Sequence, residues 1–255
     1  MNPQRIWLTG ASSGIGQALA RELAGAGHKL ALTARRREPL EELAAEFPGQ
    51  IEVLPADMTE LAEVLAVGQT LSDTWGALDL AILNAGTCEY VDVGQFDSAL
   101  FARVMAANVQ GSVHCIEAAL PLLRKGNQPR LVGVGSSVTF CPLPRAEAYG
   151  ASKAAMRYLF QSLELDLAQW NIGVSLVSPG FVETPLTAQN DFPMPMQVTS
   201  EQAARKIVKG IARGQREIRF PGLFIGFLRL LGSLPNGLRF ALTKGMARPE
   251  NGERD

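Results

Sequence analysis

A tyrosine and a lysine stand four residues apart in Tyr149-Gly150-Ala151-Ser152-Lys153. In a helix this spacing puts both side chains on one face, so an ammonium can lie near a phenol. A phenol with a pKa of about 10 is a poor base at neutral pH, and a nearby cation lowers that pKa. The pair therefore predicts a tyrosine that exchanges a proton in catalysis, although one such pair also arises by chance in a chain of this length.

A glycine-rich segment, Thr9-Gly10-Ala11-Ser12-Ser13-Gly14-Ile15-Gly16, lies between a short aliphatic run and a helical pattern. Glycines at such a turn let the backbone approach a pyrophosphate at the N-terminus of the helix. The segment also contains the G-x-S-x-G pattern of a hydrolase nucleophile elbow. That fold places its serine deep in the chain with an acid and then a histidine after it, whereas the last histidine here is His114. We therefore favour dinucleotide binding.

The glycine spacing is T-G-x-x-x-G-x-G, and with Tyr-x-x-x-Lys it resembles the short-chain dehydrogenase/reductase family. Ser136 comes thirteen residues before Tyr149, where this family presents a serine that polarises the substrate, and the adjacent Ser137 fits the spacing less well. Asn108 begins an Asn-x-x-Gly element. Alone it indicates a helix-interior asparagine, but the family has a catalytic asparagine there that bends its helix and supports a water beside the lysine. The resemblance thus implies the catalytic residues Asn108, Ser136, Tyr149 and Lys153.

Further matches imply where a dinucleotide would bind. Asn84-Ala85-Gly86 resembles the family motif beside the cofactor, and Pro179-Gly180 with Thr184 resembles the loop that receives the nicotinamide. Asp57 resembles the acid that meets the adenine, and it fits a residue near a helix start equally well. The implied cofactor-binding residues are Gly10, Ser12, Ser13, Gly14, Ile15, Gly16, Arg35, Asp57, Asn84, Ala85, Gly86, Tyr149, Lys153, Pro179, Gly180 and Thr184.

The choice of cofactor depends on the end of the second expected strand, Leu32-Thr33-Ala34-Arg35-Arg36-Arg37. An acid there would accept hydrogen bonds from a ribose 2′-hydroxyl, whereas an arginine suits a 2′-phosphate. No acid is present, so we expect NADP(H) to be preferred over NAD(H), with Arg35 as the phosphate ligand. The alternative is a solvated basic turn before the next helix.

The resemblance implies reversible hydride transfer between a nicotinamide and a carbonyl or secondary alcohol, with Tyr149 as general acid or base. Lys153 would bind the nicotinamide ribose, and Ser136 would donate to the carbonyl oxygen. Loops around Cys88 and Tyr90, over residues 138–144 and over a lid at residues 185–196 are rather apolar, which favours an apolar substrate over a sugar. A non-catalytic nucleotide sensor or scaffold is the alternative, against which the intact Ser136, Tyr149 and Lys153 argue.

Short aliphatic runs alternate with segments of helical period, which predicts repeated βα units in one α/β domain. We expect a Rossmann-type, doubly wound parallel sheet of about seven strands with helices on both faces. Residues 1–220 would form the dinucleotide-binding and catalytic domain, and residues 221–255 a hydrophobic and basic extension of it. The expected strands are 5–9, 29–34, 51–55, 80–83, 130–135, 173–177 and 217–220, and the expected helices are 15–26, 39–47, 60–74, 101–124, 149–170 and 200–214.

Composition narrows the functional classes. The 255 residues carry a net charge of −1, which argues against a nucleic-acid partner. Three cysteines and two histidines are too widely spaced for a metal site or a disulfide framework, so we expect no metal and a reducing cytoplasm. No secretion signal or membrane span is expected. Because this family commonly uses its C-terminal tail in the substrate pocket or a subunit interface, a homodimer or homotetramer is also expected.

The C-terminal tail departs from the rest of the chain. From Ala203 onward it has eleven Lys and Arg against four Asp and Glu, and residues 220–234 are strongly apolar. An apolar patch usually marks a contact, here with the substrate or another subunit. The basic excess adds a third possibility, which is peripheral attachment to an anionic membrane.

Overall fold

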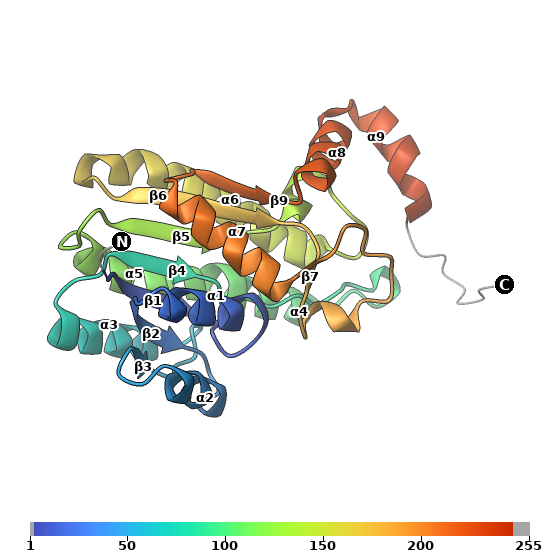
Figure 1. The fold of residues 1–255 in the computed structure, drawn as a ribbon. Coiled ribbons are helices and arrows are strands. Elements are labelled where there is room, and N and C mark those ends of the chain that lie inside the picture. Colours follow the sequence, from blue (N-terminus) through green and yellow to red (C-terminus); the bar gives the residue numbers. More distant parts are fainter. Residues whose placement is uncertain (1–2, 247–255) are drawn as a thin grey trace.

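The computed structural model describes residues 3–246 of the chain. Its central sheet has seven parallel strands in the order β3-β2-β1-β4-β5-β6-β9 (Figure 1). The order reverses between β1 and β4, which opens a crevice at the carboxyl ends of these strands. The predicted doubly wound sheet is therefore confirmed, with strands β1 (Arg5–Thr9), β2 (Lys29–Thr33), β3 (Ile51–Val53), β4 (Leu80–Leu83), β5 (Arg130–Val134), β6 (Gly173–Pro179) and β9 (Glu217–Phe220).

Two helical layers cover the sheet. Alternate residues of β1 pack on opposite sides: Ile6 and Leu8 join one buried cluster and Trp7 joins the other. The first cluster also contains side chains of α1, α2 and α7, and the second contains side chains of α3, α5 and α6. Both faces are thus dry, which explains why the strands read as aliphatic runs. The helices are α1 (Gly14–Gly25), α2 (Glu38–Glu46), α3 (Leu61–Trp75), α5 (Gly111–Leu123), α6 (Glu147–Leu167) and α7 (Ser200–Ala212).

The helix expected at residues 101–124 is longer and less regular than predicted. It begins as α4 (Ser98–Met105), because the Asp97 carboxylate accepts a hydrogen bond of 2.8 Å from the Ala99 amide and caps the helix. It then widens into a π-helical turn, Ala106–Gln110, before α5. Strands β7 (Val182–Glu183) and β8 (Val198–Thr199) form a small second sheet that the sequence did not predict.

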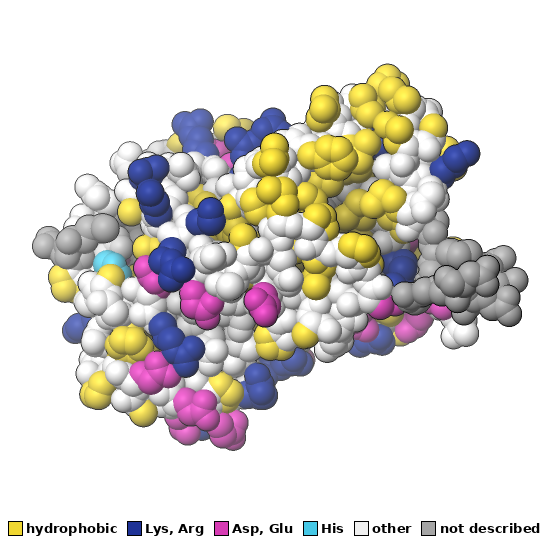
Figure 2. All heavy atoms as spheres, turned by 45° about the vertical axis from the view of Figure 1, so that its right-hand side comes forward, with side chains coloured by type: hydrophobic (Ala, Val, Ile, Leu, Met, Phe, Trp, Pro, Cys, Tyr) yellow, Lys and Arg dark blue, Asp and Glu magenta, His cyan; other side chains and the backbone are white. Residues whose placement is uncertain are grey.

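A helical hairpin follows β9, where the sequence indicated only a short apolar element. Its helices are α8 (Gly222–Ser233) and α9 (Asn236–Thr243), which project from the body of the molecule (Figure 1). Apolar side chains gather on the surface of this region (Figure 2). Within residues 3–246, no helix has the length and hydropathy needed to cross a bilayer. Residues 247–255 of the expected extension lie outside the described part of the chain.

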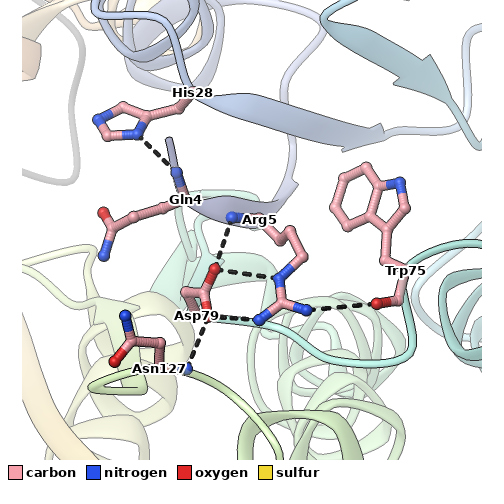
Figure 3. Close-up of polar contacts among 6 residues, drawn as sticks. All are labelled: Gln4, Arg5, His28, Trp75, Asp79 and Asn127. Atoms are coloured by element: carbon pink, nitrogen blue, oxygen red, sulfur yellow. Dashed lines mark hydrogen bonds and ion pairs between the residues drawn. The ribbon is translucent and has the colours of Figure 1, made fainter. Parts of the chain in front are cut away.

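A buried carboxylate fastens the amino edge of the sheet (Figure 3). Asp79, just before β4, accepts hydrogen bonds from the Arg5 guanidinium at 2.8 and 3.1 Å and from the Arg5 amide at 2.9 Å. It accepts another from the Asn127 amide at 2.7 Å, and Arg5 also donates to the Trp75 carbonyl. Burial opposes the charge, but the bonds from Arg5 and Asn127 outweigh it and hold the pKa of Asp79 below its usual value.

Replacing Asp79 by asparagine should lower the free energy of unfolding at neutral pH by about 3 kcal/mol, because it leaves Arg5 without its buried partner. Urea denaturation measures this loss. The lowered pKa of Asp79 means that its contribution is present at neutral pH and disappears as acid protonates the carboxyl, so the difference should shrink at low pH. Glu46→Gln, which removes the exposed ion pair with Arg21, is the matched control and should cost less than about 1 kcal/mol. Equal losses in both variants would contradict this role of Asp79.

Candidate active site

The glycine-rich loop lies at the carboxyl end of β1. The Gly10 amide donates to the Thr33 carbonyl at 2.8 Å, which holds the loop against the end of β2. Gly10 has a φ of +67°, and a Cβ there would lie 2.7 Å from Ala85 Cα, so a side chain does not fit. Helix α1 begins at Gly14, and the side chain of its N-cap residue, Ser13, makes no capping hydrogen bond. Its N-terminus can therefore bind phosphate.

The loop after β4 is tied to the end of β1. The Asn84 side-chain amide donates to the carbonyls of Thr9 and Gly10 at 3.2 and 3.0 Å. The Thr9 hydroxyl in turn accepts hydrogen bonds of 3.1 Å from the main-chain amides of Asn84 and Ala85. These contacts join the two strands on either side of the crevice and fix the position of the glycine-rich loop.

Buried Asn108 connects the β4 loop to α6. Its side-chain oxygen accepts from the Thr87 amide at 2.7 Å, and its amide donates to the Thr87 carbonyl and to Ser152 Oγ, both at 2.9 Å. Ser152 Oγ donates to the Tyr149 carbonyl at 2.7 Å. Asn108 itself lies in the π-helical turn, a distortion often found at functional sites. It therefore positions the helix that carries Tyr149 and Lys153, while Ser152 and Thr87 are partners that the sequence analysis missed.

The serine after β5 faces the tyrosine. Ser136 is the N-cap residue of a short 3-10 turn, and its hydroxyl accepts from the Val138 amide at 3.2 Å. The Ser136 side chain also lies close enough to the Tyr149 phenol to lower its pKa. Ser137 is buried. Ser136 follows β5 and Tyr149 lies in α6, so the fold brings together two residues that are thirteen positions apart in the sequence.

The ionisation of Tyr149 differs from the sequence-based expectation. Its burial raises the pKa of the phenol to about 12, and the nearby Ser136 side chain offsets this only in part. Lys153 Nζ lies 5.8 Å from the centre of the Tyr149 ring and donates to the Val134 carbonyl at 2.9 Å. Burial also lowers the pKa of Lys153 to about 8. The expected lowering of the Tyr149 pKa by Lys153 was therefore wrong for this structure, and Tyr149 is a protonated phenol at neutral pH.

The two remaining cofactor positions near β2 and β3 differ in their surroundings. Arg35 is exposed directly after the end of β2, whereas Arg37 forms an ion pair of 3.4 Å with Glu41. The Asp57 carboxylate accepts hydrogen bonds from the Thr59 amide at 2.9 Å and hydroxyl at 2.8 Å. These bonds support the local interpretation of Asp57, in which it shapes the turn before α3.

The loop after β6 reaches the start of α1. The Gly180 amide donates to the Phe220 carbonyl at 2.8 Å, which fixes Pro179 and Gly180 at the end of the strand. Thr184 approaches the start of α1 so closely that a Cβ on Gly14 would lie 3.0 Å from Thr184 Cγ2. The Thr184 hydroxyl pairs with that of Thr187 at 3.1 Å. Segments far apart in sequence therefore meet around the N-terminus of α1.

The family model described as short chain dehydrogenase matches residues 4–195 of this chain. The chain belongs to this oxidoreductase family. An uncharacterized oxidoreductase of Myxococcus xanthus is 34% identical over 241 residues, which cover 93% of this chain and 95% of the relative. The 11-beta-hydroxysteroid dehydrogenase A of Sesamum indicum is 32% identical over 240 residues, which cover 86% of this chain and 68% of the relative.

Solved structures of short-chain dehydrogenases share the fold. One from Burkholderia phymatum, in complex with NAD, superposes with a TM-score of 0.82 at 22% identity and covers 89% of this chain and 92% of its own. Another, from Streptomyces avermitilis, has a TM-score of 0.79 at 23% identity and covers 95% and 96% of the two chains. The expected resemblance is thereby confirmed for the family and for the fold.

A serine hydrolase would need a histidine beside Ser12, and neither histidine of this short-chain dehydrogenase lies there. Ser12 lies in the loop at the carboxyl edge of the sheet, whereas His28 precedes β2 at the amino edge and accepts from the Gln4 amide at 3.1 Å (Figure 3). His114 lies in α5, with Nδ1 3.0 Å from the Met58 carbonyl oxygen. Both histidines therefore have structural partners away from Ser12.

Aromatic side chains form a row beside the site. Tyr90 packs edge-on against Phe192 with ring centres 5.5 Å apart, Phe192 lies 6.1 Å from Phe181, and Phe181 lies 5.5 Å from Phe224 of α8. The Tyr90 hydroxyl also donates to Asn190 Oδ1 at 2.6 Å. The sequence indicated Tyr90, the apolar 185–196 segment and the apolar tail that contains Phe224, but it gave no signal for Phe181.

An ion pair fastens the same segment to the loop before α6. Arg145 Nη1 lies 2.8 Å from Asp191 Oδ1, and the Arg145 guanidinium lies 5.1 Å from the centre of the Tyr90 ring. Arg145 and Asp191 are 46 residues apart. No spacing rule connects residues so distant in the chain, which is why the sequence analysis missed this pair.

Proposed function

We propose that this short-chain dehydrogenase is an NADP(H)-dependent oxidoreductase that interconverts an apolar carbonyl compound and its secondary alcohol. The observation that carries the proposal is the position of Lys153 Nζ, 5.8 Å from the centre of the Tyr149 ring, with Ser136 close enough to the phenol to lower its pKa. These three groups lie at the carboxyl end of β5 and in the first turns of α6. In this proposal Ser136, Tyr149 and Lys153 are catalytic, and Asn108 is a positioning residue.

The residues around the crevice fit a nicotinamide dinucleotide. A Cβ on Gly86 would lie 2.9 Å from Asn108 Oδ1 and 3.4 Å from Lys153 Nζ. The lack of a side chain at Gly86 therefore leaves the space beside Asn108 and Lys153 free. Gly10 to Gly16 would hold the pyrophosphate, Arg35 the 2′-phosphate, and the loop from Pro179 to Thr184 the nicotinamide. The bound dinucleotide supplies hydride donation or acceptance.

The protonation states of Tyr149 and Lys153 suit carbonyl reduction. Neutral Tyr149 has a proton to give to the substrate oxygen as negative charge develops there, and it takes the proton back in alcohol oxidation. Ser136 can donate its hydroxyl proton to the same oxygen, while the Val138 amide donates to Ser136 Oγ and helps to hold the side chain in place. Lys153 binds the ribose and places a cation next to the reacting groups.

The cofactor and substrate classes rest on separate features. Exposed Arg35, with no acid at the end of β2, supports NADP(H), with NAD(H) as the weaker ligand. The row of aromatic rings that includes Tyr90 and Phe192 supports an apolar substrate. The Sesamum indicum relative bears the name of a hydroxysteroid dehydrogenase, which agrees with an apolar alcohol or ketone. We propose a cytoplasmic homodimer or homotetramer that acts on such compounds.

The test is oxidation of NADPH, followed by the absorbance of the reduced nicotinamide, with a panel of hydrophobic ketones and aldehydes. Open-chain sugars of equal carbonyl reactivity are the matched controls. We expect turnover with the hydrophobic members and little with the sugars. Tight NADPH binding without turnover on any carbonyl would favour the non-catalytic sensor or scaffold.

Binding of NADPH should weaken as the pH rises through about 8, because Lys153 then loses the charge that attracts the anionic dinucleotide. Fluorescence titration of NADPH between neutral and alkaline pH measures this. The pH dependence should disappear in Lys153→Met, whereas it should persist in Lys125→Met, which removes an exposed lysine. A flat profile in the wild type would contradict the placement of Lys153 at the ribose.

A further inference from the structure

Helix α8 has two different faces. Its inner face buries Ile225 and Leu228 against the body of the protein. Its outer face carries Leu223, Phe227 and Leu230, which are spaced by four and three residues and are 60–75% exposed. This spacing places the three side chains in one stripe along the helix. The stripe is uncovered in the monomer.

Helix α9 also exposes apolar side chains. It buries no residue, and Leu238, Phe240 and Leu242 are 51–67% exposed. Arg239 fixes the hairpin, because its guanidinium donates to the Gly232 carbonyl at 3.2 Å and to Asn236 Oδ1 at 2.8 Å. The exposed leucines and phenylalanines are thus held on a defined projection, and Figure 2 shows the apolar surface gathered there. Patches of this kind mark contact sites.

The charge of the hairpin indicates what it contacts. Residues 221–246 contain Arg229, Arg239 and Lys244 and no acidic residue. A second copy packed on this surface around a twofold axis would bring the basic side chains of the two hairpins close together, which is unfavourable. An anionic lipid surface complements them and also accepts the apolar stripe.

We infer that residues 222–246 are a peripheral docking surface for an anionic lipid bilayer. The stripe of Leu223, Phe227 and Leu230 enters the boundary between headgroups and acyl chains, and Lys244 and Arg229 contact lipid phosphates. The hairpin lies in the interface, as amphipathic helices do. This binding is separate from catalysis, so its failure would leave the proposed activity untouched.

The test is co-sedimentation of the full-length chain with vesicles of phosphatidylcholine alone or mixed with phosphatidylglycerol. We expect binding to the mixed vesicles that weakens in high salt, and much less binding to phosphatidylcholine alone. The double variant Phe227→Gln/Leu230→Gln should bind about tenfold more weakly or worse, and Lys244→Gln about fivefold more weakly. The matched controls are Leu165→Gln and Lys125→Gln, which replace exposed residues elsewhere and should bind normally.

Thermal unfolding of each variant checks its fold, and an unchanged Tm is expected because all the replaced side chains are exposed. Absence of vesicle binding by folded wild type would overturn the inference. So would equal losses in Leu165→Gln and in the double variant. Sedimentation equilibrium tests whether a second copy of the chain binds this surface instead. A wild-type dimer that becomes a monomer in the double variant, together with no vesicle binding, would show that a second copy covers the hairpin.

Discussion

Replacing Tyr149 by phenylalanine is expected to lower kcat for carbonyl reduction by about a thousandfold, since general acid catalysis contributes factors of this order. The variant lacks only the phenolic hydroxyl, which holds the transferable proton because burial raises the pKa of Tyr149 to about 12. The glycine-rich loop is untouched, so NADPH affinity should change by less than about twofold. Steady-state kinetics and fluorescence titration measure the two quantities.

Tyr158→Phe is the matched control, because Tyr158 is an exposed tyrosine on the same helix, α6. It should behave as wild type. Lys153→Ala should impair both turnover and NADPH binding, because the Lys153 ammonium lies near the Tyr149 ring and beside Gly86. A Tyr149→Phe enzyme with near-normal kcat would show that another group supplies the proton.

The ratio of NADPH to NADH affinity should fall about tenfold or more in Arg35→Ala. A charge-assisted hydrogen bond to the 2′-phosphate is worth roughly 1.5 to 3 kcal/mol, and NADH offers no such acceptor. The effect should therefore appear in the dissociation constant of NADPH and leave that of NADH nearly unchanged. Parallel fluorescence titrations with both cofactors give the ratio.

Arg37→Ala is the control for general loss of positive charge in this turn, because Arg37 is paired with Glu41. It should reduce the ratio much less than Arg35→Ala. Equal affinities for the two cofactors in the wild type, or an unchanged ratio in Arg35→Ala, would contradict the assignment of Arg35.

The sequence predicted the sheet well because its five inner strands are buried on both faces. Every expected strand is present, with ends that differ by two residues at most. The helix expected at residues 101–124 was predicted least well, because the sequence did not indicate the π-helical turn around Asn108. One extra residue in a helical turn leaves no hydrophobic pattern. Helix α9 was also missed, because a helix that buries no residue lacks the period from which helices are recognised.

The sequence could predict which residues form the candidate site, but it could not predict their burial, their hydrogen bonds or their pKa values. Spacing selected Ser136 over Ser137, and the structure places Ser136 against Tyr149. The direction of the Tyr149 pKa shift was wrong because desolvation depends on packing that the sequence does not record. The bond between Asn108 and Ser152 spans 44 residues, so only the folded chain reveals it.

Hydride transfer from the nicotinamide to a carbonyl carbon is tested most directly by turnover of a hydrophobic ketone with NADPH that carries deuterium at both C4 positions. Mass spectrometry then locates the label in the alcohol. We expect one deuterium on the carbinol carbon in the wild-type product and a turnover rate greatly reduced in Tyr149→Phe. Alcohol that forms without deuterium on that carbon, or folded wild-type protein that binds NADPH and reduces no carbonyl, would contradict hydride transfer by this site.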